Sequence, residues 1–149
     1  MSNYNINMRQ NNAVALMSRI REKANRFIVK ELEERGVKGI VPSHGEIMVH
    51  LFDSKEYAMK ELAQKIHRTK PTVTILVDKL VEYGYVIKEK SLEDSRVTYI
   101  KLTEKGMELR PIFQEISDKL NALVYDGVTE QEAIFFEKML FNINKRFEA

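Results

Sequence analysis

The sequence predicts a mainly α-helical protein with one small β-hairpin. Apolar residues recur at steps of three and four along the N- and C-terminal parts of the chain, which is the pattern of amphipathic helices. In the middle, two short strand-like segments, residues 85–90 and 96–102, flank the polar, turn-forming residues 91–95. Only three prolines and six glycines occur among the 149 residues, so long irregular segments are not expected.

The N-terminal part is predicted to form one long helix over residues 5–35, which Gly36 ends. Its apolar side chains, spaced to share one face, are Ala13, Met17, Ile20, Ala24, Phe27 and Ile28. Ser43 and Glu46 have the spacing of a capping box, which predicts the start of a short helix just after Pro42. The side chains that this helix buries are Ile47, Met48, Leu51 and Phe52.

The middle of the chain is predicted to fold as strand, helix, tight turn and helix before the hairpin. A short strand at 57–59 precedes a helix at 60–67, and Thr69 caps a second helix over 69–83. The inward-facing side chains of this second helix are Val73, Leu76, Val77 and Leu80. Because the small residue Ala63 lets the two helices cross closely, the region is predicted to be a helix-turn-helix.

Two more helical segments are predicted after the hairpin. Thr103 caps the first, in which Pro111 predicts a kink or a fresh helix start. Thr129 and Glu132 form a capping box for the second. The apolar surface of this last helix is wider than one packed side, which predicts a partner helix. The candidate dimerisation residues are Ile20, Phe135, Phe136, Leu140, Ile143 and Phe147.

The composition excludes several classes of protein. Without cysteine there is no disulfide framework, thiolate nucleophile or cysteine metal site. No apolar run approaches 18 residues and residues 1–10 are polar, so we expect a cytoplasmic protein without a membrane partner. No phosphate-binding loop and no hydrolase motif occurs, so we expect no enzyme activity, cofactor or metal. The net charge is only +2, but residues 60–101 are the basic part of the chain.

The helix over 69–83 has an outward face suited to the major groove of DNA. Its small, polar and basic side chains can bond phosphates and base edges, and its isoleucine can contact a thymine methyl group. The helix N-terminus adds N–H donors for phosphate. An ordinary solvated helix face is the alternative. The candidate DNA contacts are Thr69, Lys70, Pro71, Thr72, Thr74, Ile75 and Lys79.

The hairpin carries three cations around its turn, next to that helix: Lys88, Lys90 and Arg96. Arginine at a hairpin tip suits the narrow minor groove, where the negative potential is strongest. Asp94 is expected to hold the Arg96 guanidinium by a charge-assisted hydrogen bond. An ordinary charged hairpin is the alternative, but its place beside the basic helix favours DNA binding.

These segments resemble the winged helix-turn-helix of the MarR-type transcriptional regulators. The residues that carry the resemblance are Leu62-Ala63, Thr72-Val73-Thr74, Leu76-Val77-Asp78-Lys79-Leu80, Gly84-Tyr85-Val86, and the wing signature Asp94-Ser95-Arg96 with Leu102-Thr103-Glu104-Lys105-Gly106. The flanking helices match too, so the resemblance covers nearly the whole chain. Ser95 and Ile75 replace residues that are often basic in this family, so no base preference is carried over.

The resemblance implies one MarR-like domain over 1–149, with a winged helix-turn-helix lobe at 43–102 and dimerisation helices at 5–35 and 103–149. It implies a homodimeric repressor of a palindromic operator in double-stranded DNA, with Arg96 in the minor groove. It also implies a small-molecule effector bound between the dimerisation helices and the lobe. The candidate pocket residues, for which ordinary core positions are the alternative, are Phe27, Met48 and Phe52.

Two other interpretations remain open. A zinc-sensing regulator would use His44 and His50, but these are six residues apart and do not share a helix face. A winged helix that binds a protein partner instead of DNA would show no salt-dependent DNA affinity.

Overall fold

The structure is a computed structural model that describes residues 8–148. It is mainly helical with a three-stranded antiparallel sheet, which confirms the predicted fold class. The elements in chain order are α1 (Ala13–Glu34), α2 (Pro42–Ser54), β1 (Glu56–Ala58), α3 (Met59–Lys65), α4 (Lys70–Glu82), β2 (Val86–Lys90), β3 (Thr98–Leu102), α5 (Glu104–Met107), α6 (Leu109–Val124) and α7 (Glu130–Arg146).

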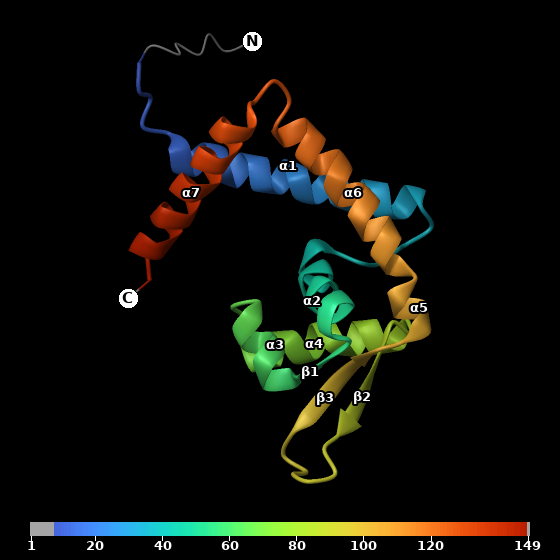
Figure 1. Cartoon of the computed structure of the whole chain (residues 1–149). Helices are drawn as coiled ribbons and strands as arrows, with labels where there is room; N and C mark the ends of the chain where they lie inside the picture. Colours follow the sequence, from blue (N-terminus) through green and yellow to red (C-terminus); the bar gives the residue numbers. More distant parts are fainter. Residues whose placement is uncertain (1–7, 149) are drawn as a thin grey trace.

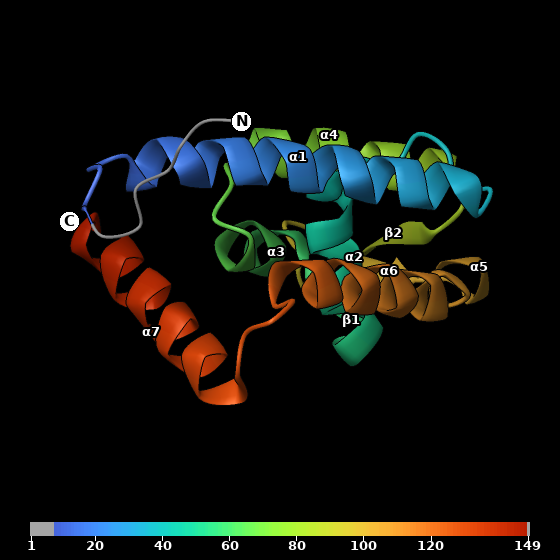
Figure 2. The same ribbon diagram turned by 90° about the horizontal axis from the view of Figure 1, so that it is seen from above.

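The elements form a lobe and a helical layer above it. In Figure 1, α2, α3, α4 and the sheet lie below α1 and α6, and the β2–β3 hairpin protrudes from the lower end. After α5 the chain leaves the lobe as α6, and α6 packs against α1. Figure 2, seen from above, shows α7 turned away from the lobe and diverging from α1, with its C-terminal end toward the start of α1.

Helix α1 begins at Ala13 and not at residue 5 as predicted. Residues 5–7 lie outside the described part of the chain, and residues 8–12 are not helical. Asn11 has a left-handed φ of 56°, and Asn12 is the N-cap. Asparagine tolerates this conformation because its short amide can bond nearby backbone groups, so Asn11 and Asn12 precede the first helical residue, Ala13, which is also where the apolar spacing begins.

The predicted capping box of Ser43 and Glu46 is wrong. Helix α2 begins at Pro42, and its N-cap Val41 donates its backbone N–H to Nδ1 of His44 at 3.1 Å. Proline suits the first helical position because its φ is preset and it has no N–H to leave unpaired, which favours the earlier start. The capping side chain is therefore histidine.

The predicted threonine caps at Thr69, Thr103 and Thr129 are confirmed, since each hydroxyl accepts a backbone N–H three residues later. Thr129 also forms the full capping box, because its own N–H is donated to Glu132 Oε1 at 3.0 Å. Pro111 lies in the first turn of α6, where its missing N–H costs no helical hydrogen bond. The fresh helix start predicted there is confirmed.

The core of the lobe fixes α4 relative to the hairpin. Strand β3 is central, so Ile100 pairs with Tyr57 of β1 on one side and with Lys88 of β2 on the other. The core side chains with no exposed surface are Ile47, Met48, Leu51, Leu62, Val73, Val77, Leu80 and Ile100. At Gly106 the chain has no space for a side chain, because a Cβ would lie 2.1 Å from the carbonyl oxygen of Tyr85.

Within residues 8–148, no helix is both long enough and apolar enough to cross a membrane.

Candidate nucleic-acid interface

Helix α4 buries one face and exposes the other. Val73, Val77 and Leu80 are fully buried on the inner face. The turn before the helix reverses the chain through a left-handed His67, with a φ of 55°. On the outer face Ile75 is 71% exposed, although it lies at the middle of the helix. The predicted helix-turn-helix is thus present, with α4 as its outer helix.

The wing arginine is held in place as predicted. Arg96 donates its backbone N–H and Nε–H to Asp94 Oδ1, at 3.0 and 3.1 Å, and Nη2 donates to Asp94 Oδ2 at 3.1 Å. These bonds lower the pKa of the Asp94 carboxyl, so it stays charged. The Arg96 side chain nevertheless remains 89% exposed. The predicted contact between these two residues is confirmed, and it leaves the guanidinium bonded on one side and largely exposed to solvent.

A concave surface, which we name the basic groove, lies between the start of α3, the start of α4 and the hairpin. Its volume is about 700 Å³. Its lining residues are Ala58, Met59, Lys60, Glu61, Lys70, Thr74, Lys88, Lys90, Arg96, Val97 and Thr98. Glu61 is the single carboxylate among them, and it accepts the backbone N–H of Ala58 at 3.2 Å. The lining therefore holds five cations and one carboxylate.

The basic groove brings together five of the predicted DNA contacts, which are Lys70, Thr74, Lys88, Lys90 and Arg96. The other predicted contacts, Thr69, Pro71, Thr72, Ile75, Lys79 and Asp94, do not line it. Lys79 turns toward the end of α4, where Nζ lies 3.7 Å from Glu82 and 5.2 Å from the centre of the Tyr83 ring. Lys88 forms an ion pair with Asp78 of α4, so part of the positive charge of the groove is neutralised within the protein.

Lys60 was not among the predicted DNA contacts, but it lines the basic groove from the first turn of α3. The only sequence signal was its place at the start of the basic segment 60–101. Periodicity shows which face of a helix is buried but not which helix ends meet in space. The convergence of α3 with the hairpin therefore needed the tertiary structure.

A second concave surface, which we name the apolar groove, lies between α1, the end of α6 and α7. It has a volume of about 1050 Å³. Four of the six predicted dimerisation residues line it: Ile20, Phe135, Phe136 and Leu140. Ile143 is half-buried outside the lining, and Phe147 is exposed beyond the end of α7. Helix α7 has no fully buried residue, so its apolar side chains stay largely exposed in a single chain.

A small apolar cavity of about 190 Å³ lies between α1, α2 and α6. Its lining residues are Ile28, Leu32, Ile40, Val41, Pro42, Gly45, Val49, Phe113, Ile116, Ser117 and Leu120. None of the three predicted pocket residues lines it. Met48 and Phe52 belong to the buried core, and Phe27 is partly buried with Lys119 Nζ 5.8 Å from the centre of its ring. Met48 and Phe52 are therefore ordinary core residues, which was the alternative to a pocket role.

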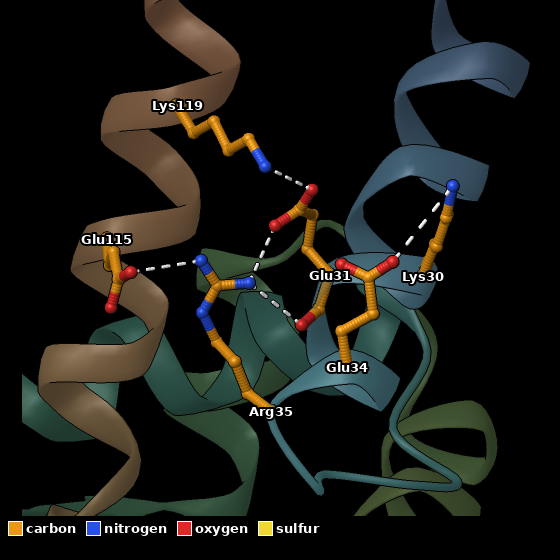
Figure 3. Close-up of polar contacts among 6 residues, drawn as sticks. All are labelled: Lys30, Glu31, Glu34, Arg35, Glu115 and Lys119. Carbon is orange, nitrogen blue, oxygen red and sulfur yellow. Dashed lines mark hydrogen bonds and ion pairs between the residues drawn. The ribbon is translucent and has the colours of Figure 1, made fainter.

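A charged cluster joins α1 to α6 beside this cavity (Figure 3). Glu31 is 5% exposed and accepts hydrogen bonds from Lys119 Nζ at 2.7 Å and from Arg35 Nη1 at 2.6 Å. Arg35 Nη2 also donates to Glu115 at 3.0 Å. Hydrogen bonds from Lys119, and then from Arg35, lower the pKa of Glu31 despite its burial. Because Leu32 and Leu120 follow Glu31 and Lys119 in the chain, the cluster fixes two walls of the cavity.

The histidines proposed for zinc have other surroundings. His44 Nδ1 accepts the N–H of Val41, and burial lowers the pKa of this histidine, so the ring stays neutral. The His50 ring lies edge-on to Tyr57, with 6.3 Å between the ring centres. Among the residues described, no three His, Cys, Asp or Glu side chains gather in a way that could hold a metal ion.

Sequence comparison supports the same family as the wing signature. The family model of the transcriptional regulator SarA/Rot matches residues 45–113. The HTH-type transcriptional repressor YetL of Bacillus subtilis is 31% identical over 112 residues, which cover 73% of this chain and 66% of YetL. MhqR, an HTH-type transcriptional regulator of the same organism, is 25% identical over 126 residues, which cover 84% of each chain.

Solved structures share the fold over almost the whole chain. The MepR–DNA complex of S. aureus has a TM-score of 0.80 and 21% identity, with 90% of this chain and 97% of that chain covered. A MarR variant from E. coli complexed with operator DNA has a TM-score of 0.77 and 18% identity, with 91% and 99% covered. The fold, the wing signature and these relatives together place the chain in the MarR-type family of winged helix-turn-helix transcriptional regulators, which are not enzymes.

Proposed function

We propose that this protein is a sequence-specific DNA-binding regulator that represses transcription as a homodimer on a palindromic operator. The observation that carries the proposal is the convergence of five cations on the basic groove from three separate segments, Lys60, Lys70, Lys88, Lys90 and Arg96. Cations at this density neutralise DNA phosphates and release their counterions. DNA as a partner implies a cytoplasmic location.

The two parts of the lobe contact different grooves. Helix α4 enters the major groove through its exposed face, with Lys70 and the N–H groups of its first turn directed to phosphate. Arg96 at the tip of the hairpin enters the minor groove, where a guanidinium gains most from the negative potential. Asp94 restrains the guanidinium before DNA is bound, so less side-chain entropy is lost on binding.

The homodimer forms through the apolar groove and α7. Phe135 is 65% exposed in the single chain, and Phe136 and Met139 are exposed on the same helix. A second copy that covers these side chains removes an apolar patch that a monomer rarely leaves open to water. Two lobes related by the dimer axis would then contact half-sites whose centres lie about 34 Å, one helical turn, apart.

An effector is proposed for the cavity between α1, α2 and α6. The cavity lies between the dimerisation helices and the lobe, and its lining holds no charged side chain, so it suits an apolar molecule. A ligand that binds better to one spacing of the two lobes shifts the population toward that spacing, and so changes DNA affinity.

The test is fluorescence anisotropy with the purified protein on DNA from upstream of its own gene and on a scrambled duplex, over a series of salt concentrations. We expect tight binding that prefers the native fragment, with log K falling steeply with log salt. Arg96→Ala weakens binding to both duplexes, whereas Arg26→Ala, a matched change at an exposed ion pair of α1, leaves it unchanged. Weak, salt-independent binding to both duplexes would instead favour a winged helix that binds a protein partner.

A further inference from the structure

We propose that Ile75 is a specificity-determining residue that contacts the 5-methyl group of a thymine in each half-site. This inference rests on the proposed function, because it assigns the recognition of one base to one side chain of α4. Thymine is distinguished from cytosine in the major groove partly by this methyl group, and an apolar side chain is the natural partner for it.

The first observation is the position of Ile75. It is 71% exposed at the middle of α4, on the face opposite the buried Val73 and Val77. Its preceding neighbour Thr74 lines the basic groove, together with Lys70 one turn earlier. A duplex held by the cations of this groove would therefore meet Ile75 at the groove's edge.

The second observation is that the polar side chains around Ile75 are already bonded within the protein. The Thr74 hydroxyl donates to the carbonyl oxygen of Lys70 at 2.9 Å. Asp78 is paired with Lys88, and Lys79 with Glu82. A side chain that exchanges such a bond for one to a base edge gains less in net free energy than a side chain that starts without a partner. At the middle of α4, apolar contact through Ile75 is the contact that requires no such exchange.

The third observation concerns charge. A carboxylate beside a phosphate backbone is repelled, and Asp78 lies one turn after Thr74 on the exposed side of α4. Its ion pair with Lys88 offsets that repulsion, so the surface around Ile75 is open to DNA. The cations Lys70 and Lys90 attract the backbone to the same side.

Single exposed isoleucines are common on protein surfaces and do not by themselves indicate a ligand. The test therefore measures the contribution of the thymine 5-methyl group alone. A duplex selected from a random-sequence pool with the wild-type protein serves as the probe. Each thymine of one half-site is then replaced singly by deoxyuridine, which removes only the 5-methyl group. At one position we expect the wild-type protein to bind about fourfold more weakly, equal to about 0.8 kcal/mol for one buried methyl group.

The variants decide the assignment. For Ile75→Ala we expect the uracil substitution at that position to leave the DNA affinity unchanged. For Ile75→Val we expect it to lower the affinity, but by less than for the wild-type protein. Ile87→Ala is the matched control: Ile87 is 48% exposed on β2, and strand alternation places it on the sheet face of Glu89 and Lys101, away from α4. For Ile87→Ala we expect the same fourfold loss of affinity on the uracil substitution as for the wild-type protein. Circular dichroism checks that each variant is folded.

The outcomes separate the two proposals. If every thymine gives the same uracil effect in the wild-type protein and in Ile75→Ala, the role of Ile75 is overturned while the DNA-binding function stands. If no duplex is selected over random DNA, both proposals fail.

Discussion

Lys119 of α6 donates a hydrogen bond to the buried carboxylate of Glu31 in α1 at 2.7 Å, so one ion pair joins the two helices that flank the apolar cavity. Arg35 supplies the second cation to the same carboxylate (Figure 3). A carboxylate at 5% exposure is stable there because both of its oxygens are bonded to cations.

Glu31→Gln removes this charge and is expected to lower the melting temperature, because Lys119 loses its carboxylate partner and the partly buried Arg35 keeps one carboxylate, Glu115, in place of two. The pKa of Glu31 is lowered from its ordinary 4.5, so its contribution to stability is complete above that value. It is lost as the pH falls through the lower, folded-state pKa. Thermal unfolding as a function of pH measures both effects. Glu22→Gln, at an exposed ion pair of α1, is the control and should change little.

Asp94→Asn tests whether the wing arginine must be held. Removal of a negative charge near DNA would by itself strengthen binding, but loss of the bonds to Arg96 should weaken it about fivefold, as for one net hydrogen bond. Anisotropy at fixed salt measures the change. In the Arg96→Ala background the same substitution should not weaken binding further. Tighter binding of the single variant would contradict a positioning role for Asp94.

The His44 cap predicts a loss of stability in weak acid. Burial, and then the charge of Lys79, lower the pKa of His44 below its ordinary 6.5. As the pH falls below this value, the unfolded chain takes up a proton at His44 while the folded protein does not. The free energy of unfolding therefore decreases as the pH falls from about 6.5 toward the lower pKa of the folded protein. Urea unfolding at a series of pH values should show a shallower decrease of this free energy in His44→Gln than in the wild-type protein.

Two glycine substitutions are expected to change the free energy of unfolding in opposite directions. Gly106→Ala places a methyl group 2.1 Å from the Tyr85 carbonyl oxygen, so backbone must move, and we expect about 1–3 kcal/mol of destabilisation. Gly45 lies inside α2, where the nearest atom to a Cβ is Phe113 Cε2 at 3.5 Å. Alanine favours the helix there, so Gly45→Ala should stabilise by about 0.5–1 kcal/mol. Chemical denaturation measures both, and equal effects would contradict the packing described for α5.

The proposed dimer is tested at the apolar groove. Phe136→Glu or Leu140→Glu should shift the protein from dimer to monomer in sedimentation velocity, because each places a charge in the surface that the partner covers. Asn142→Glu on the same helix adds the same charge at an exposed polar position and should leave the dimer intact. A dimer that survives both groove substitutions would place the interface elsewhere.

Local signals in the sequence predicted most of the fold. Threonine caps, the apolar face of α4 and the polar turn of the hairpin act within a few residues, so their spacing is visible in the chain. The cap of α2 was assigned to the wrong residues because Ser43 and Glu46 match the common pattern, while proline at position 42 and the histidine ring at position 44 made a competing start. The start of α1 was predicted too early, because the range 5–35 reached beyond the first apolar face residue, Ala13, and across the left-handed Asn11.

The helices, the wing signature and the pairing of Asp94 with Arg96 could be predicted from the sequence, because they depend on residues close together in the chain. Three other features became visible in the folded chain alone: Lys60 joins the wing cations, Lys88 is paired with Asp78, and the cavity is lined from α1, α2 and α6. These contacts link residues from different elements. Their distances follow from how the core packs, which no local pattern of residues specifies.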